Sequence, residues 1–281
     1  MSFNAFSKSG FQISSAYAQS LRDRADATRD VEIDLGVGAS GSSERIRIAT
    51  SDGHRQAACD LINRMYAWRG YGNNHQVKSG PSYTTFSYMS GDRTVGTLTL
   101  AVDSEDGLAA DSTFSGELNS FRRVPRARVC ELTKFAFDTQ GASKQMLASL
   151  FHVVFLYGRR RHACTDLFIE VNPRHVRFYE IMLAFKRVGS LKTNESVGAP
   201  SQLMHLRVAD IAELINENAG QGDSAVSRSL YPFFLGATEE TRIRSELSPL
   251  FNAADRMMTS TIEALEPPVS LKANAAPPNS A

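Results

Sequence analysis

One uncharged stretch near the middle of the chain limits the possible folds more than any other feature. Residues 145–158 run without a single Asp, Glu, Lys or Arg. Their apolar side chains recur at the three- and four-residue spacing of one helix face, at Leu147, Leu150, Phe151 and Val154. The pattern predicts a helix at 143–161 that is buried on most sides, and such a helix needs other elements packed around it.

The segments around this helix predict alternating strands and helices. A strand is expected at 127–137 and an apolar strand at 166–171, after which Asn172-Pro173 starts a helix, because Asn caps and Pro suits the first turn. The other expected elements are strands at 45–50, 83–89, 95–102, 186–191 and 202–208, helices at 57–69, 209–217 and 239–264, and an irregular stretch at 103–126. This order predicts one α/β domain with a mixed central sheet flanked by helices.

Composition changes at both ends of the chain. Residues 1–44 are rich in Asn, Ser, Gly, Arg and Asp, and residues 267–281 hold four of the ten prolines, so both are predicted to be disordered tails. The first tail has room for a short amphipathic helix at 16–27. Between the tails, we expect a folded domain at 45–210 and a helical C-terminal extension at 211–266.

Charge, hydropathy and cysteine usage exclude several classes of protein. With 31 Lys and Arg against 30 Asp and Glu, the net charge of +1 argues against binding nucleic acid through bulk charge. The sequence has no apolar run long enough for an integral membrane segment and no secretion signal at its start. Three widely separated cysteines without CxxC spacing favour reduced thiols in a cytoplasmic protein and predict no metal site; they are Cys59, Cys130 and Cys164.

Two segments resemble motifs of known acyltransferases. The strand Ile169-Glu170-Val171-Asn172-Pro173, with Phe178-Tyr179 in the helix after it, resembles the last motif of GNAT-type N-acyltransferases. The strand Glu131-Leu132-Thr133-Lys134-Phe135 looks like a strand of the acyl-homoserine-lactone synthases. Taken together with residues 150–154 and 166–175, these segments are similar to the bacterial long-chain N-acyl amino acid synthases, including N-acyltyrosine synthases. The similarity covers roughly residues 45–210. An ordinary strand–helix corner is the alternative for the first segment.

The resemblance implies a GNAT-like acyltransferase fold and an N-acyltransferase activity. The donor would be a long-chain fatty acyl group on acyl carrier protein, and the acceptor would be the α-amine of an amino acid. No cofactor is implied beyond the acyl-phosphopantetheine thioester, which is a co-substrate. Two rival functions remain: an acyltransferase of the same fold that uses acyl-CoA or another amine, and a non-catalytic module that binds an acyl carrier or a lipid.

Two departures from the family patterns bear on the substrates. Acetyl-CoA enzymes of this fold carry a glycine-rich loop that holds the CoA pyrophosphate, whereas residues 138–144 contain one glycine. A weak pyrophosphate site fits a donor on acyl carrier protein, whose pantetheine arm has a single phosphate. Lactone synthases also have an acidic pair in the loop after the first helix. The corresponding residues of this chain, 69–74, contain no Asp or Glu, so lactone synthesis is disfavoured.

Three residues are the predicted catalytic groups. An ammonium must lose a proton before it attacks a thioester, and Glu131 is the predicted base if burial raises its pKa; a structural ion pair with Lys134 or an arginine is the alternative. Lys134 would orient Glu131 or contact the substrate carboxylate or acyl carbonyl, unless it simply faces solvent. Tyr179 would protonate the leaving sulfur, unless it is a core residue.

The remaining predicted site residues bind substrate or partner. Phe135, Phe137 and Phe151 are predicted walls of an apolar acyl tunnel, with Asn172 beside it, although each phenylalanine suits a core equally well. Basic clusters are predicted to dock the acidic carrier protein, unless they are solvated helix ends; they include Arg122, Arg123, Arg159, Arg160 and Arg161. His152 is expected to be a core histidine. The sequence leaves open the amino acid, the acyl length, the oligomeric state and the role of residues 221–265.

Overall fold

The computed structural model describes residues 31–38, 41–138 and 142–250. The amphipathic helix expected at 16–27, the tail at 267–281, and the part of the predicted helix at 239–264 beyond residue 250 therefore lie outside the described residues.

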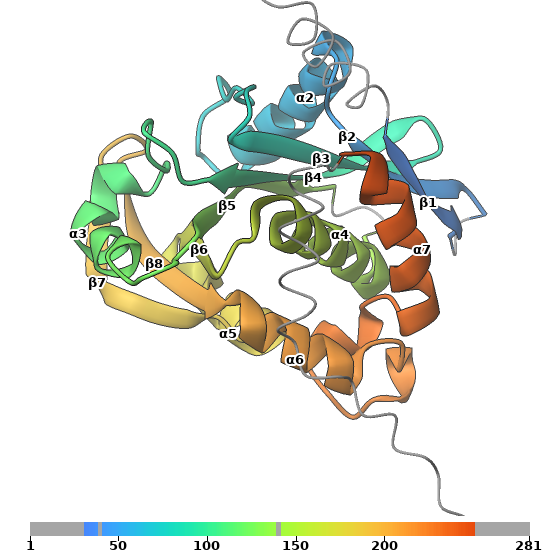
Figure 1. The fold of residues 1–281 in the computed structure, drawn as a ribbon. Helices are drawn as coiled ribbons and strands as arrows, with labels where there is room; N and C mark the ends of the chain where they lie inside the picture. Colours follow the sequence, from blue (N-terminus) through green and yellow to red (C-terminus); the bar gives the residue numbers. More distant parts are fainter. Residues whose placement is uncertain (1–30, 39–40, 139–141, 251–281) are drawn as a thin grey trace, which may run out of the picture.

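An eight-stranded mixed sheet forms the centre of the molecule (Figure 1). Its order is β1-β2-β3-β4-β5-β6-β8-β7, and every neighbouring pair is antiparallel except β5 and β6, which run parallel. The strands are β1 Glu32–Val37, β2 Ser43–Ile48, β3 Tyr83–Ser90, β4 Arg93–Val102, β5 Val129–Phe137, β6 Asp166–Val171, β7 Lys186–Asn194 and β8 Ala199–Arg207.

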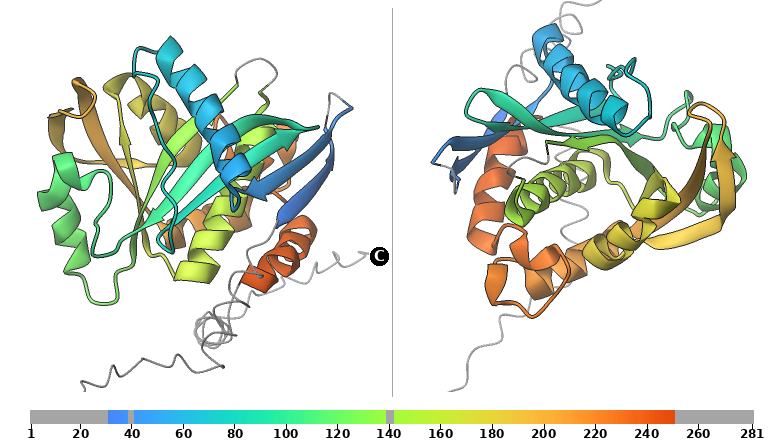
Figure 2. Two further views of the ribbon diagram at one scale, coloured as in Figure 1. Left: turned by 90° about the horizontal axis from the view of Figure 1, so that it is seen from above. Right: turned by 180° about the vertical axis from the view of Figure 1, so that it is seen from behind.

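Helices cover both faces of this sheet (Figure 2). They are α2 Asp52–Trp68, α3 Asp111–Arg122, α4 Lys144–His162, α5 Pro173–Leu183, α6 Val208–Asn218 and α7 Ala237–Leu247, with short 3₁₀ turns η1 Gly222–Ser224, η2 Tyr231–Phe233 and η3 Ser248–Leu250. Helices α2 and α4 lie on opposite faces (Figure 1), and the largest core cluster is built around α4, as its uncharged sequence predicts. No helix within the described ranges is long and apolar enough to cross a membrane.

Local capping signals place three of the helices. Ser51 caps α2 by accepting a hydrogen bond from the backbone N–H of His54, and Ser143 caps α4 in the same way through Met146. The side chain of Asn172 accepts a hydrogen bond of 3.2 Å from the Arg174 N–H, and Pro173 occupies the first turn of α5. The helix start predicted at Asn172-Pro173 is therefore confirmed. Helix α2 begins five residues before its predicted start.

Two elements occur where the sequence analysis expects none. Strand β1 falls inside the predicted tail at 1–44, and it pairs with β2 and buries Ile33 completely. Helix α3 falls inside the stretch at 103–126 that was expected to be irregular, and it buries Phe114 and Leu118 against the sheet. At the other end, α7 stops at Leu247 and gives way to a 3₁₀ turn, so the predicted helix at 239–264 is interrupted there.

Candidate active site

Strands β5 and β6 separate partway along their length. Their parallel register covers three pairs, and the last joins Glu131 to Phe168. Strand β5 then continues to Phe137 with β4 along one edge, and the described residues provide no strand for its other edge. Without a partner strand, the backbone groups on this edge must bond to side chains, water or a ligand, because buried N–H and C=O groups require partners.

A β-bulge lies within this open half of β5. Thr97 pairs with Ala136 and Thr99 with Thr133, so two residues of β5, Lys134 and Phe135, oppose one residue of β4. Lys134 adopts a left-handed conformation with φ of 53°, and its carbonyl accepts a hydrogen bond of 3.0 Å from the Thr97 hydroxyl. Such a bulge bends a strand and redirects its side chains, and bulges often lie next to active sites.

Glu131 is the last β5 residue that pairs with β6, and its side chain is buried. Only 2% of the residue is exposed, and one carboxylate oxygen accepts a hydrogen bond of 3.3 Å from the Ala110 N–H. Burial raises the pKa of this carboxyl to about 7, although the backbone hydrogen bonds of Ala110 and Ala109 oppose the rise. Among the described residues no Lys or Arg forms an ion pair with Glu131, so the structural ion pair considered above is not present.

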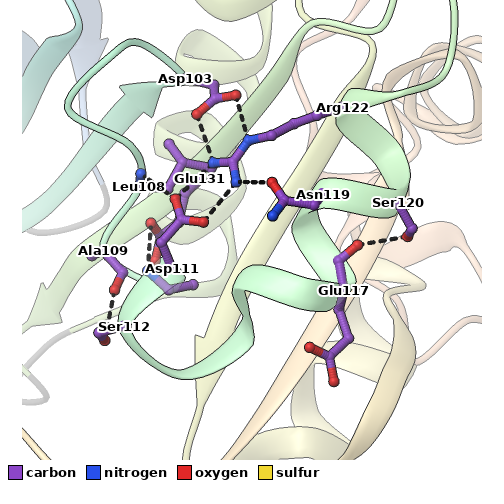
Figure 3. A network of polar contacts seen from close by, with 11 residues as sticks. Asp103, Leu108, Ala109, Asp111, Ser112, Glu117, Asn119, Ser120, Arg122 and Glu131 are labelled. Atoms are coloured by element: carbon purple, nitrogen blue, oxygen red, sulfur yellow. Dashed lines mark hydrogen bonds and ion pairs between the residues drawn. The ribbon is translucent and has the colours of Figure 1, made fainter.

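The loop that covers Glu131 is held by Arg122 (Figure 3). Its guanidinium donates two hydrogen bonds of 2.7 Å to Asp103 and two of 2.6 Å to Asp111. Asp111 also accepts a hydrogen bond from the Leu108 N–H, and Arg122 lowers the pKa of the Asp111 carboxyl. This two-carboxylate clamp fixes the loop that places the Ala110 N–H against Glu131, so Arg122 has structural partners of its own.

A second carboxylate lies on the same face as Glu131. Glu170 is two residues beyond Phe168 on β6, and its charge contributes to the raised pKa of Glu131. It accepts hydrogen bonds of 2.6 Å from Ser201 and 2.7 Å from Asn194, so it is held in place by β8 and β7. Glu170 is therefore a fixed neighbour whose charge disfavours ionisation of Glu131.

Lys134 lies on the same side of the sheet as α2 and makes no ion pair with Glu131 among the described residues. Its ammonium is 3.5 Å from Nδ1 of His75 in the loop after α2. The side chain is half-buried, and burial lowers the pKa of the ammonium. The predicted contact between Lys134 and a substrate group therefore has a partly desolvated cation available for it.

Two tyrosines from different helices approach the open edge of β5. The Tyr66 hydroxyl of α2 donates a hydrogen bond of 3.3 Å to the Phe135 carbonyl, and burial raises the Tyr66 pKa to about 12. Tyr179 of α5 is largely buried against Phe185, and burial raises its pKa also, with a further contribution from Tyr66. Within the described part of the chain the Tyr179 hydroxyl has no hydrogen-bond partner, so it can donate to a bound group.

Residues that the sequence analysis did not select form the rim of this region. Arg174, in the first turn of α5, donates a hydrogen bond to the Tyr71 hydroxyl and lies 5.2 Å from the centre of its ring. The His75 Nε2–H donates a hydrogen bond of 2.8 Å to the Tyr71 carbonyl, and the His75 backbone N–H donates to the side-chain oxygen of Asn63 in α2. The loop at 70–78 thereby bridges α2 and α5 across the separated strands, and only the clustering of Tyr, Arg and His near two helix ends could have pointed to it.

A narrow apolar cavity of about 40 Å³ lies between α4 and the sheet. Phe151 lines it, together with Leu132, the first β5 residue after the paired segment. Phe135 is adjacent, with its ring centre 5.3 Å from that of Phe151. Phe137 instead packs on Tyr88 and over Gly96, where a Cβ would approach its ring to 2.3 Å, so Phe137 is a core residue away from the cavity.

The predicted docking arginines lie near the start of β5, whereas the open edge belongs to the second half of that strand. Helix α4 returns from the end of β5 to the start of β6, so its last turn, with Arg159 to Arg161, comes back beside the beginning of β5. The Thr165 N–H donates to the Arg128 carbonyl and ties the two regions together. Arg123 is exposed in this region. The strands separate at their other ends, beside the start of α5.

The described residues contain no group of three or more His, Cys, Asp or Glu side chains placed to hold a metal ion. The loop at 138–144, which the resemblance compares with a pyrophosphate-binding loop, includes residues 139–141, which lie outside the described residues.

Comparison with known proteins gives one family match and several structural matches. The model of a family described as N-acyl amino acid synthase FeeM matches residues 57–207, more than half of the chain. The solved structure of FeeM, from uncultured soil microbes, is 30% identical with a TM-score of 0.57, and the match covers 61% of this chain and 95% of that one. No curated protein matches.

Two more distant structures also match. The acyl-homoserine-lactone synthase LasI is 12% identical over 60% of this chain and 91% of its own, with a TM-score of 0.43. The GNAT domain of PAT from S. lividans is 12% identical over 63% of this chain and 97% of its own, with a TM-score of 0.41. The expected fold, with a mixed sheet flanked by helices, is confirmed.

Proposed function

The chain belongs to the FeeM family of N-acyl amino acid synthases and is an N-acyltransferase, and from this premise we propose its substrates and its catalytic groups. We propose that it transfers a long-chain fatty acyl group from acyl carrier protein to the α-amine of an amino acid. The observation that carries the proposal is the buried Glu131 carboxyl, with a pKa of about 7, at the point where β5 loses its partner strand.

The proposed reaction joins nitrogen to the acyl carbon and releases the carrier thiol. Glu131 accepts a proton from the amine, directly or through one water, as the C–N bond forms. Backbone N–H groups on the open edge of β5 stabilise the oxyanion. The C–S bond then breaks, and the Tyr179 hydroxyl, which has no hydrogen-bond partner among the described residues, donates its proton to the departing sulfur.

The charged groups around the open edge suit the two proposed substrates. Lys134 lies on the same face as Glu131 and is proposed to bind the carboxylate of the amino acid. Arg174 and Arg69, which flank the Tyr71 loop, are proposed to contact the phosphate of the pantetheine arm or the acidic carrier protein. The apolar cavity beside Leu132 is proposed to take the beginning of the acyl chain.

The test uses purified protein with matched donors. Fatty acyl groups on acyl carrier protein and on CoA are each incubated with a mixture of amino acids, and products are identified by mass spectrometry. We expect masses of a fatty acid plus an amino acid minus water with the carrier-protein donor, and almost none with Glu131→Gln. Product from acyl-CoA alone would overturn the proposed donor, and acylation of other amines alone would overturn the proposed acceptor.

A further inference from the structure

A short aromatic segment after α6 packs against the apolar cavity. This segment, residues 229–235, is called the aromatic turn here, and it contains the 3₁₀ turn η2. Two of its side chains, Tyr231 and Phe234, line the cavity and are almost completely buried. The FeeM family match ends at residue 207, before this turn, so family membership does not account for it.

Backbone and side-chain hydrogen bonds fasten the aromatic turn to α5. The Leu230 N–H donates 2.9 Å to the Met182 carbonyl, and the Tyr231 hydroxyl donates 3.0 Å to the Leu183 carbonyl. These acceptors are in the last turn of α5, where helix carbonyls lack intrahelical partners. The turn therefore satisfies a helix end while it holds Tyr231 against the cavity.

His152 fastens the other side of the turn to α4. Its Nδ1 accepts a hydrogen bond of 3.1 Å from the Leu235 N–H, so in the neutral ring the hydrogen is on Nε2, 3.3 Å from a carboxylate oxygen of Glu240 in α7. The His152 ring also stacks on Phe234, with ring centres 5.1 Å apart. The expectation of a core histidine is confirmed, and its ring forms the surface on which Phe234 packs.

We propose that the aromatic turn sets the length of acyl chain that the enzyme accepts, with Phe234 and Tyr231 as the limiting side chains. This inference rests on the proposed long-chain acyl donor. The cavity has strands on one side and α4 on another, and about 40 Å³ is too small for a long chain. A longer chain can extend only where the lining gives way, and a ring held by a short turn yields more readily than the strands of the sheet.

The chain itself offers a matched control. Phe233 precedes Phe234 in the same turn, but its ring lies 5.0 Å from the Lys144 ammonium and does not line the cavity. Phe233→Ala and Phe234→Ala therefore remove the same ring from adjacent positions, and only the second enlarges the cavity. Ile211→Phe, from α6, adds volume to the lining and provides the opposite change.

The experiment measures binding of straight-chain fatty acids of increasing length to the full chain, by displacement of a fluorescent fatty acid. We expect Phe234→Ala to shift the tightest-binding length upward, with about fourfold tighter binding for each further methylene that is buried. Ile211→Phe should shift it downward, and Phe233→Ala should leave it unchanged. Phe234→Leu replaces Phe234→Ala if thermal melting shows that the smaller side chain prevents folding.

Binding and transfer separate this inference from the proposed function. Three results would overturn the role of the aromatic turn. The Phe234 and Ile211 variants could keep the wild-type length preference, Phe233→Ala could shift it by as much as Phe234→Ala, or the wild type could bind no fatty acid. A shifted preference in a protein that forms no N-acyl amino acid would support the turn and contradict the proposed function.

Discussion

The two halves of β5 differ in how they are held, and the difference separates support from reactivity. From Val129 to Glu131 the strand has β4 on one side and β6 on the other. From Leu132 to Phe137 the described residues pair the strand with β4 alone, and the bulge at Lys134 interrupts even that pairing. The paired half fixes the carboxyl of Glu131, and the open half offers backbone groups to a substrate. In the proposed mechanism, the base and the oxyanion site thus come from consecutive residues of one strand.

The paired half of β5 also tolerates a buried ionisable group. A buried carboxylate without an ion-pair partner costs folding free energy, and the raised pKa of Glu131 reports that cost. The neighbouring loop is fixed by the Arg122 clamp, so the Ala110 N–H stays in place. Proteins accept such local costs at functional sites when the surroundings hold the group firmly.

Removing the carboxylate from the paired half should have the largest effect. Glu131→Gln is expected to lower kcat/KM about 10²- to 10⁴-fold, because a general base contributes that much. In the wild type, the rate should rise with pH to a plateau above about 7, since the base works only when ionised. Steady-state kinetics across pH checks both, and a wild-type profile flat from pH 5 to 8 would remove Glu131 from the mechanism.

Stability provides the matching control for Glu131. A raised folded pKa gives a stability contribution that is complete below the unfolded value of 4.5 and is lost as pH rises to about 7. At pH 8, the free energy of unfolding of Glu131→Gln should therefore exceed that of the wild type by up to about 3 kcal/mol, as measured by denaturant melts. A variant that is both slower and less stable at pH 8 would indicate a structural carboxylate.

Tyr179→Phe tests the proposed acid. We expect kcat to fall about tenfold to a hundredfold, because the departing thiolate loses its proton donor. Stability should change by less than about 1 kcal/mol, because no described residue bonds the hydroxyl. Kinetics with acyl donors whose thiols differ in pKa make the test specific. The donor with the thiol of lower pKa, which is the better leaving group, should lose less of its kcat. Equal losses for both donors would contradict the acid role.

Arg122→Ala tests the support of the paired half. The change leaves Asp103 and Asp111 facing each other without their shared cation, and we expect a loss of about 2 kcal/mol in unfolding free energy. The pKa from the rate profile should also move, because the Ala110 N–H is no longer held against Glu131. Arg123→Ala removes an exposed neighbour and should stay within about 0.5 kcal/mol of the wild type. Equal effects of the two changes would dismiss the clamp.

Much of the fold could be predicted because its signals are local. Asn172-Pro173 marks a helix start through bonds within one turn, and the uncharged stretch at 145–158 indicates a buried helix. Helix α3 was missed because its apolar face is short and Phe114 breaks it with non-helical dihedral angles. Strand β1 was missed because its residues gain from pairing with β2, which its own sequence does not signal.

The site was less predictable because it depends on contacts between distant residues. The burial of Glu131 follows from its place on an apolar strand, and the chemistry that needs a base points to it. Nothing in the sequence places Tyr66 at the Phe135 carbonyl, because 69 residues separate them. Nor does a local pattern reveal the bulge, since Lys134 is an ordinary residue in a conformation that favours glycine.

Changing the bulge residue should have the smallest effect on stability and a selective effect on binding. At φ of 53° Lys134 pays a strain that glycine avoids, while glycine adds entropy to the unfolded chain, so Lys134→Gly should stay within about 0.5 kcal/mol of the wild type. Thr133→Gly, at the neighbouring paired position, should cost about 1 kcal/mol because nothing offsets that entropy. Denaturant melts of the two variants measure this difference.

Kinetics of the same variants decide what the Lys134 side chain does in the open half of β5. If its ammonium binds the substrate carboxylate, Lys134→Gly raises KM for the amino acid about tenfold and leaves KM for the acyl donor unchanged, because the bulge itself persists. Thr133→Gly should change neither constant in that selective way. A rise in the donor KM alone would instead show that the bulge positions the thioester, and the carboxylate site would then have to be sought among the arginines of the rim.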